Sequence, residues 1–152
     1  MDSVKQLRRD YTTFVKSAHR EGIISRQFIH LQALHGADEY PQFVSTVVNQ
    51  FITLSEGILP KLDLALEQNL VNSEVKSNVH RMKGSSMSVG ARKVNDLCIG
   101  FQAYYDAGNQ EKCLEFLSQI KEEYHLAKDK LQTMLRLQQQ ILEAGGTIPN
   151  LK

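Results

Sequence analysis

A histidine and a lysine lie three residues apart in the run HRMKGSS, which begins at His80. On a helix, residues three and four apart share a face, so Lys83 and Gly84 both lie one turn beyond the imidazole. The imidazole is a nucleophile, and a lysine beside it can neutralise phosphate charge. Glycine removes the side chain that would hold a donor protein away. These residue types therefore suit a histidine that receives a phosphoryl group from another protein.

Other side chains share the predicted face of His80. Helical spacing places Lys76, Ser77 and Met87 near the ring, whereas Arg81 points about 100° away from it. We expect these four residues to contact the partner protein, and Lys83 to steady the phosphoryl oxygens. An isolated histidine on a polar helix face is more often simply solvated, so the spacing alone leaves that alternative open.

The spacing His-x-x-Lys occurs a second time, at His125 and Lys128. There Glu122 precedes the histidine by one turn and Asp129 follows it, so carboxylates surround the ring and would repel a phosphoryl donor. His80 has no such neighbour on its predicted face. The surroundings therefore favour His80 as the reactive residue.

Composition indicates a compact globular chain. Of the 152 residues, 41% are hydrophobic and 23% are charged, with nine Gly and three Pro. Eighteen basic residues against 17 acidic ones give a net charge of +1, which argues against a general nucleic-acid binder. No apolar run has the length of a signal peptide or a membrane span. We expect one soluble, intracellular domain over residues 1–152, with no nucleic-acid or membrane partner and with Cys98 and Cys113 as buried free thiols.

Apolar residues recur with the period of a helix almost throughout, and no strand-like alternation competes. The pattern predicts an all-α fold of about six helices, an antiparallel four-helix bundle with additional N-terminal helices packed on it. The helices are expected from Val4 to near Gly22, from Ser25 to near Gly36, from Pro41 to Leu66 with a kink or short break at Pro60, from Ser73 to Gly90, from there to Gly108, and from about Gln110 to Glu143. Residues 145–152 are expected to form a loose tail. The predicted core positions of the helix that carries His80 are Val75, Val79, Met82, Ser86 and Val89.

Other kinds of site find little support in the sequence. No HExxH motif or His/Cys cluster indicates a metal site, and no Gly-rich phosphate loop follows a strand. Ser85, Ser86 and Ser88 lack the context of a serine nucleophile. A hydrolytic or metal-dependent helical bundle would need paired carboxylates and histidines facing a core, and that pattern is absent from the sequence.

The segment HRMKGSSMSVGA, from His80 to Ala91, resembles the phosphorylation segment of plant histidine-containing phosphotransfer proteins, whose usual form is HQLKGSSSS[IV]GA. The resemblance continues through the run QQILEAGG, from Gln139 to Gly146, and covers nearly the whole chain. Its second half is highly specific.

The resemblance implies a carrier in a multistep phosphorelay, as in plant cytokinin signalling. His80 would accept a phosphoryl group from an aspartate on the receiver domain of a hybrid sensor histidine kinase and pass it to an aspartate of a response regulator. The chain would have no kinase activity, ATP site or cofactor of its own, because the receiver would bring the Mg²⁺. We expect a monomer that moves between cytoplasm and nucleus.

Three residues depart from the pattern of the family. Arg81 replaces the usual Gln, Met87 replaces a common Ser, and Thr53 stands where relatives often carry an acidic residue. None of these changes removes the phosphoacceptor. The alternative function is a helical adaptor that binds receiver domains without transferring phosphate and so damps the relay.

Overall fold

The computed structural model describes residues 2–35, 42–69 and 73–151. Within these ranges the chain forms six α-helices and no strand. The helices are α1 (Asp2–Arg20), α2 (Arg26–His35), α3 (Phe43–Glu67), α4 (Ser73–Val89), α5 (Arg92–Asp106) and α6 (Gln110–Glu143). The predicted all-α fold of six helices is confirmed. The predicted stop near Gly36 and start at Pro41 lie outside the described residues.

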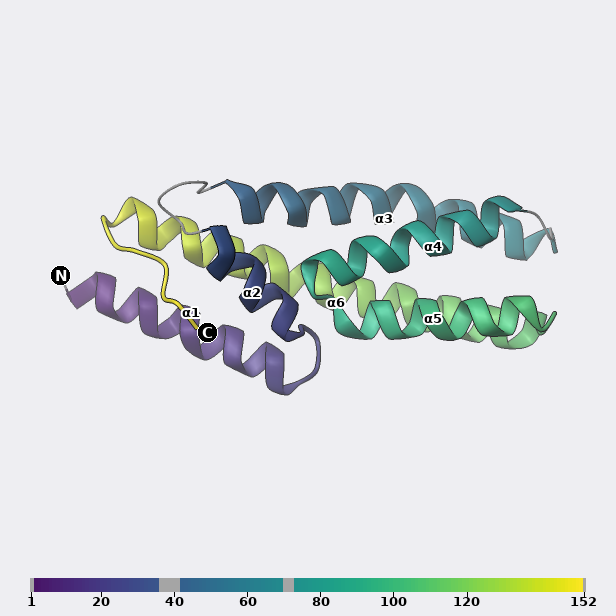
Figure 1. The fold of residues 1–152 in the computed structure, drawn as a ribbon, viewed down its shortest axis with the longest axis horizontal. Coiled ribbons are helices and arrows are strands. Elements are labelled where there is room, and N and C mark those ends of the chain that lie inside the picture. The colour runs from purple at the N-terminus through teal and green to yellow at the C-terminus, as the bar shows by residue number, and fades with distance from the viewer. Residues whose placement is uncertain (1, 36–41, 70–72, 152) are drawn as a thin grey trace.

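Helices α3 to α6 form an antiparallel four-helix bundle (Figure 1). Neighbouring contacts run from α3 to α4, from α4 to α5, from α5 to α6 and back from α6 to α3. Helix α1 packs on α6, and α2 lies against α3 and α4. Because α6 is longer than its bundle partners, its C-terminal part is left to be covered by α1 (Figure 1). The predicted bundle with additional N-terminal helices is confirmed.

The turn between α4 and α5 is held by Gly90, whose φ is +75°. Its carbonyl accepts a hydrogen bond from the Ser25 backbone N–H at 2.8 Å, and the Ala91 N–H donates to the Ser86 carbonyl at 2.8 Å. A Cβ at Gly90 would lie 2.7 Å from the backbone nitrogen of Phe28. Both the backbone conformation and the close approach therefore require glycine, and the end of α4 is fastened to the start of α2.

Polar contacts also join α3 to α6 across the bundle. The Glu56 carboxylate accepts hydrogen bonds from the Tyr124 hydroxyl at 2.7 Å and from the Lys128 ammonium. These contacts, that of Lys128 foremost, lower the pKa of Glu56. A second pair joins Lys121 to Asp63 at 2.9 Å. The two contacts set the register of the longest helix against α3.

Pro60 lies inside α3, which continues unbroken to Glu67. The predicted break is therefore wrong, while a kink stays a prediction. Proline costs about 3 kcal/mol in a helix interior because it lacks an N–H and its ring crowds the preceding turn. Pro60 itself is exposed, and buried Ile58, Leu59 and Leu62 hold the helix to the bundle on both sides of it. Burial on this scale, roughly 1.5–3 kcal/mol for each large side chain, offsets the cost.

Both cysteines are free and buried, as predicted. Burial raises the pKa of the Cys98 thiol to about 12 and also raises that of Cys113. After α6 the chain contacts α1, because the Arg8 Nε donates to the Thr147 carbonyl at 3.0 Å and Pro149 is buried. Among the described helices, none combines the length and apolarity that a membrane crossing requires.

We predict that Gly90→Ala lowers the free energy of unfolding by about 3 kcal/mol, because an alanine there meets both an unfavourable φ and the Phe28 backbone. Gly108→Ala is the matched control: its φ is +72°, but nothing lies within 4 Å of the added Cβ. It should cost only about 1 kcal/mol. Urea denaturation measures both. Equal losses would show that the contact with α2 adds nothing.

Candidate functional site

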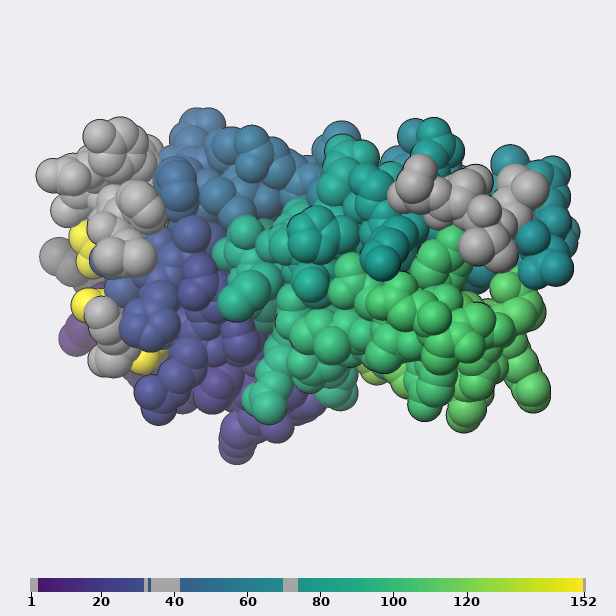
Figure 2. All heavy atoms as spheres, turned by 45° about the vertical axis from the view of Figure 1, so that its right-hand side comes forward, coloured from purple at the N-terminus to yellow at the C-terminus, as the bar shows by residue number. Residues whose placement is uncertain are grey.

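Helix α4 has one buried side and one solvent-exposed side. Its predicted core residues Val75, Val79, Met82, Ser86 and Val89 are all buried. His80 lies off that stripe and is exposed. In the space-filling view, α4 forms an open part of the surface between α2, α3 and α5 (Figure 2). In the part of the chain that the structure describes, the imidazole makes no hydrogen bond or ion pair, so its nitrogens are available to a reactant from outside.

Lys83 lies one turn beyond His80 and is half-buried. Its backbone carbonyl accepts two hydrogen bonds, from the Ser86 hydroxyl and from the Asn95 side-chain amide of α5, both at 2.9 Å. Its positive charge acts against the rise in the pKa that burial causes at the Cys98 thiol on α5. The ammonium forms no ion pair within the described residues, so it remains available to an incoming anion.

Gly84 is exposed in the interior of α4, and a Cβ built on it would meet nothing within 4 Å. Glycine in a helix interior is less favourable than alanine by about 0.5–1 kcal/mol. The fold of this chain therefore gains nothing from the absence of a side chain here. What the absence provides is space above the backbone next to His80, where a partner can approach.

The residues predicted to contact a partner are placed around His80, although their roles stay predictions. Lys76 pairs with Asp106 of α5 at 3.1 Å, and both side chains are more than half exposed. Ser77 and Arg81 line a groove of about 560 Å³ between α3 and α4. Met87, at the other end of the face, is 68% exposed. An apolar side chain this exposed beside a reactive histidine is suited to packing against a protein surface.

Sequence reasoning missed Asn95, which fixes the turn of α4 that carries Lys83. Its amide group joins two helices through one hydrogen bond across 12 positions in the chain. Asparagine is an unfavourable residue within a helix, and its place one turn into α5 was the available signal. Spacing alone could not identify its partner.

The structure separates the two His-x-x-Lys copies further. His125 on α6 lies close enough to Glu56 of α3 to contribute to the lowered pKa of that carboxyl. Its ring also lies 5.3 Å from that of Tyr124. A third carboxylate thus joins Glu122 and Asp129 near this ring. Across the described ranges, no three side chains among His, Cys, Asp and Glu gather where they could hold a metal ion.

Comparison with known proteins agrees with this geometry. The family model described as the Hpt domain matches residues 46–141, which include all of α4. Histidine-containing phosphotransfer protein 1 of Arabidopsis thaliana is 42% identical over 98% of this chain and 96% of its own length. Protein 5 of the same series is 39% identical over 97% and 95%. Among solved structures, a histidine-containing phosphotransfer protein from Medicago truncatula is similar with a TM-score of 0.85 and 35% identity, covering 97% of this chain and all of that one.

We predict that Gly84→Ala raises the free energy of unfolding by about 0.5–1 kcal/mol, because it removes backbone entropy from the unfolded chain and meets no clash. The matched control is Gly57→Ala, since Gly57 is also exposed inside a helix with nothing within 4 Å of its Cβ. Both should shift the urea midpoint upward by similar amounts. Destabilisation at position 84 alone would mean that this fold itself needs the glycine.

Proposed function

Because this chain belongs to the family of histidine-containing phosphotransfer proteins, we propose that it carries phosphoryl groups on His80 in a two-component phosphorelay. It accepts the group from a phospho-aspartate on the receiver domain of a hybrid sensor histidine kinase and passes it to an aspartate of a response regulator. The observation that carries the proposal is the exposed His80 beside an unpaired Lys83 and a bare Gly84, within the segment that the Hpt domain matches.

Transfer is an in-line displacement between two proteins. The lone pair of an imidazole nitrogen forms the N–P bond while the P–O bond to the partner's aspartate breaks, and the carboxylate leaves with that electron pair. The second transfer reverses these steps on another aspartate. Such reactions depend mainly on positioning and on stabilising the charge of the phosphoryl oxygens. The packed helix α4, on which the exposed ring stands, supplies the positioning.

Lys83 and Gly84 have complementary roles in this proposal. The ammonium of Lys83 reaches the phosphoryl oxygens and neutralises charge that builds up between the two proteins. The bare backbone at Gly84 lets the partner's reactive aspartate come within bonding distance of the ring. Exposed Met87 packs against the same partner, and Arg81 and Ser77 contact it along the α3 side.

The chain contributes neither a kinase active site nor a cofactor in this proposal, and the Mg²⁺ needed for transfer belongs to the receiver. We extend the proposal to a single-domain monomer in cytokinin signalling that works in cytoplasm and nucleus, which rests on the resemblance to plant relatives. The monomer is supported by the exposed large apolar side chains of the described residues, which are scattered over α3, α4, α5 and α6. A dimer interface would group them.

A non-transferring adaptor is the competing function. It would bind receivers through the same face but would have no use for an unpaired, exposed imidazole with a cation beside it. Retention of His80, Lys83 and Gly84 together favours transfer. Phosphoryl transfer from a phospho-receiver to His80 separates the two functions.

We predict that His80→Gln abolishes phosphorylation and leaves the melting temperature nearly unchanged, because the ring is exposed and unbonded. Wild type, His80→Gln and His125→Gln are incubated with a radiolabelled phospho-receiver and Mg²⁺. Acid-labile label is expected on wild type and His125→Gln only. Label on His80→Gln would assign the acceptor elsewhere, and no label on wild type with several competent receivers would favour the adaptor.

We predict that Lys83→Ala slows transfer about tenfold, the effect of about 1.4 kcal/mol of lost charge stabilisation, while Lys83→Arg retains most of the rate. Rapid-quench transfer rates at saturating receiver measure the chemical step separately from docking. Lys93→Ala, an exposed lysine on α5, is the control and should react like wild type. An unchanged rate in Lys83→Ala would remove the ammonium from the mechanism.

A further inference from the structure

Charges are segregated around α1. At 100° per residue, five cations fall within about a third of the helix circumference, and between Lys5 and Arg20 no acidic residue lies among them. These cations are Lys5, Arg8, Arg9, Lys16 and Arg20, and all are exposed. The acidic side chains Asp10 and Glu21 lie on a different part of the circumference, where they accept hydrogen bonds from Gln6 at 2.8 Å and Ser17 at 3.3 Å.

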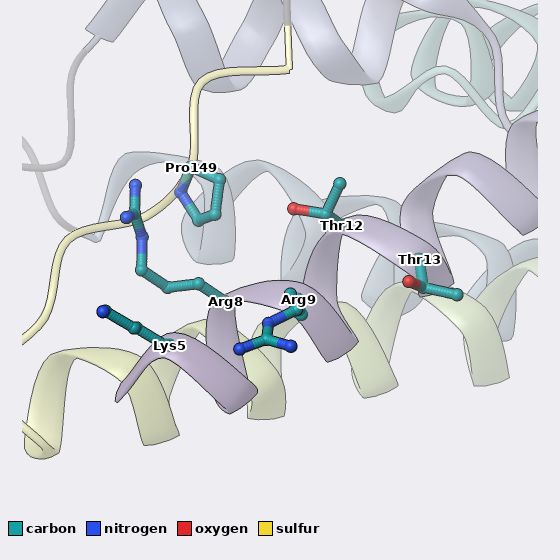
Figure 3. Close-up of a pocket in the computed structure, with 6 residues that line it drawn as sticks. All are labelled: Lys5, Arg8, Arg9, Thr12, Thr13 and Pro149. Carbon is teal, nitrogen blue, oxygen red and sulfur yellow. The ribbon is translucent and has the colours of Figure 1, made fainter. Parts of the chain in front are cut away.

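The surface along these cations is hollowed. One depression of about 410 Å³ is lined by Lys5, Arg8 and Arg9 together with Pro149 of the C-terminal segment (Figure 3). A second, of similar volume, continues from Thr13 past Lys16 to Arg20. Thr13 lines both, so they adjoin along α1.

A third depression joins this surface to the transfer face. It measures about 470 Å³, shares His19 with the second depression, and ends at Met87 of α4. Arg26 adds positive charge to its lining, whereas Arg92, which also lines it, pairs with Asp96 at 4.0 Å. We call the three adjoining depressions the basic furrow. Among the lining residues that the structure describes, none is acidic.

The cations of α1 are available to a ligand. Arg8 uses its Nε on the Thr147 carbonyl, which holds the C-terminal segment beside the furrow (Figure 3). The other four, Lys5, Arg9, Lys16 and Arg20, form no ion pair with any described residue. From Lys5 to Arg20 the helix rises about 22 Å, the length of about seven residues of extended chain. A row of cations of this length, four of them without an ion pair to any described residue, raises the local concentration of an acidic ligand.

We propose that the basic furrow binds an acidic, extended segment of the same partner protein that docks on the His80 face. This inference rests on the proposed function for the identity of the partner, since the furrow opens onto Met87 at the edge of that face. The segment would run from the transfer face along α1 and strengthen an otherwise small contact. Its charge would also speed encounter and select among partners.

Two other classes of ligand fit the furrow less well. A membrane surface would call for apolar anchors, yet the exposed large apolar side chains of the described residues lie on α3 to α6 and not on α1. A nucleic acid would see a chain of net charge +1, whose acidic side chains elsewhere oppose its phosphates. A short acidic protein segment can contact the furrow alone and so avoids the acidic side chains elsewhere on the surface.

The first test uses a fluorescein-labelled poly-glutamate peptide and the variant Arg9→Glu/Lys16→Glu. Wild type should bind the peptide at low salt, and the variant should bind it at least about tenfold more weakly. The matched control Lys112→Glu/Arg136→Glu makes the same change of net charge on α6 and should bind like wild type. If both variants bind the peptide equally weakly, net charge alone explains the loss of binding and the furrow proposal is wrong. Tighter binding to duplex DNA or to anionic vesicles than to the peptide would overturn the proposal.

The second test measures docking and transfer with phospho-receiver domains. The furrow variant should bind receivers more weakly at low salt, should approach wild type at high salt, and should keep its transfer rate at saturation. Gly84→Glu should fail to dock at either salt concentration. If wild type accepts no phosphoryl group, the proposed function fails and the peptide result still stands. If wild type transfers and the furrow variant binds every receiver as wild type does, only the furrow proposal fails.

Discussion

The burial of one side of α4 is the constraint on which the rest of the structure depends. Val79 and Met82 flank His80 in sequence and are buried, so the ring cannot turn inward without removing them from the core. The same burial fixes the direction of Lys83 and the openness of Gly84. Asn95 and Gly90 then join α4 to α5 and to the start of α2 through hydrogen bonds. Packing on the buried side of α4 offsets the cost of about 0.5–1 kcal/mol that Gly84 brings to its exposed side.

Much of this arrangement could be predicted from the sequence, because helical periodicity is a local property. The core stripe of α4, the turns at Gly90 and Gly108, and the extent of α6 follow from the spacing of apolar residues and glycines. The expected break at Pro60 is wrong because a local penalty is visible in the sequence, whereas the packing that offsets it is not. Asn95 escaped notice for a related reason, since its partner Lys83 lies on another helix. Contacts between residues of different helices can be identified only from a three-dimensional structure.

The distribution of charge gives a different lesson. A net charge near zero argues against general binding of nucleic acid, yet it does not reveal how unevenly the charges are distributed over the surface. Basic residues gather on one side of α1. Among the described acidic residues, three pair with lysines of another helix: Glu56 with Lys128, Asp63 with Lys121 and Asp106 with Lys76. Net charge does not show where charges cluster. The positions of Arg9 and Lys16 on α1 show a basic cluster once the buried side of that helix is known. The chain can therefore be nearly neutral and still present a directional field to a partner.

The exposure of His80 has one more consequence. No described part of the chain covers the ring, so a phosphoryl group can reach it without displacing any described segment. The loaded and empty forms then differ at the surface by little more than the group itself. Such a protein carries the signal in the phosphoryl group and not in a change of shape. The direction of phosphoryl transfer is then set by the relative transfer potentials of the phospho-aspartates on its partners. Control over the direction of transfer therefore lies in the partner proteins.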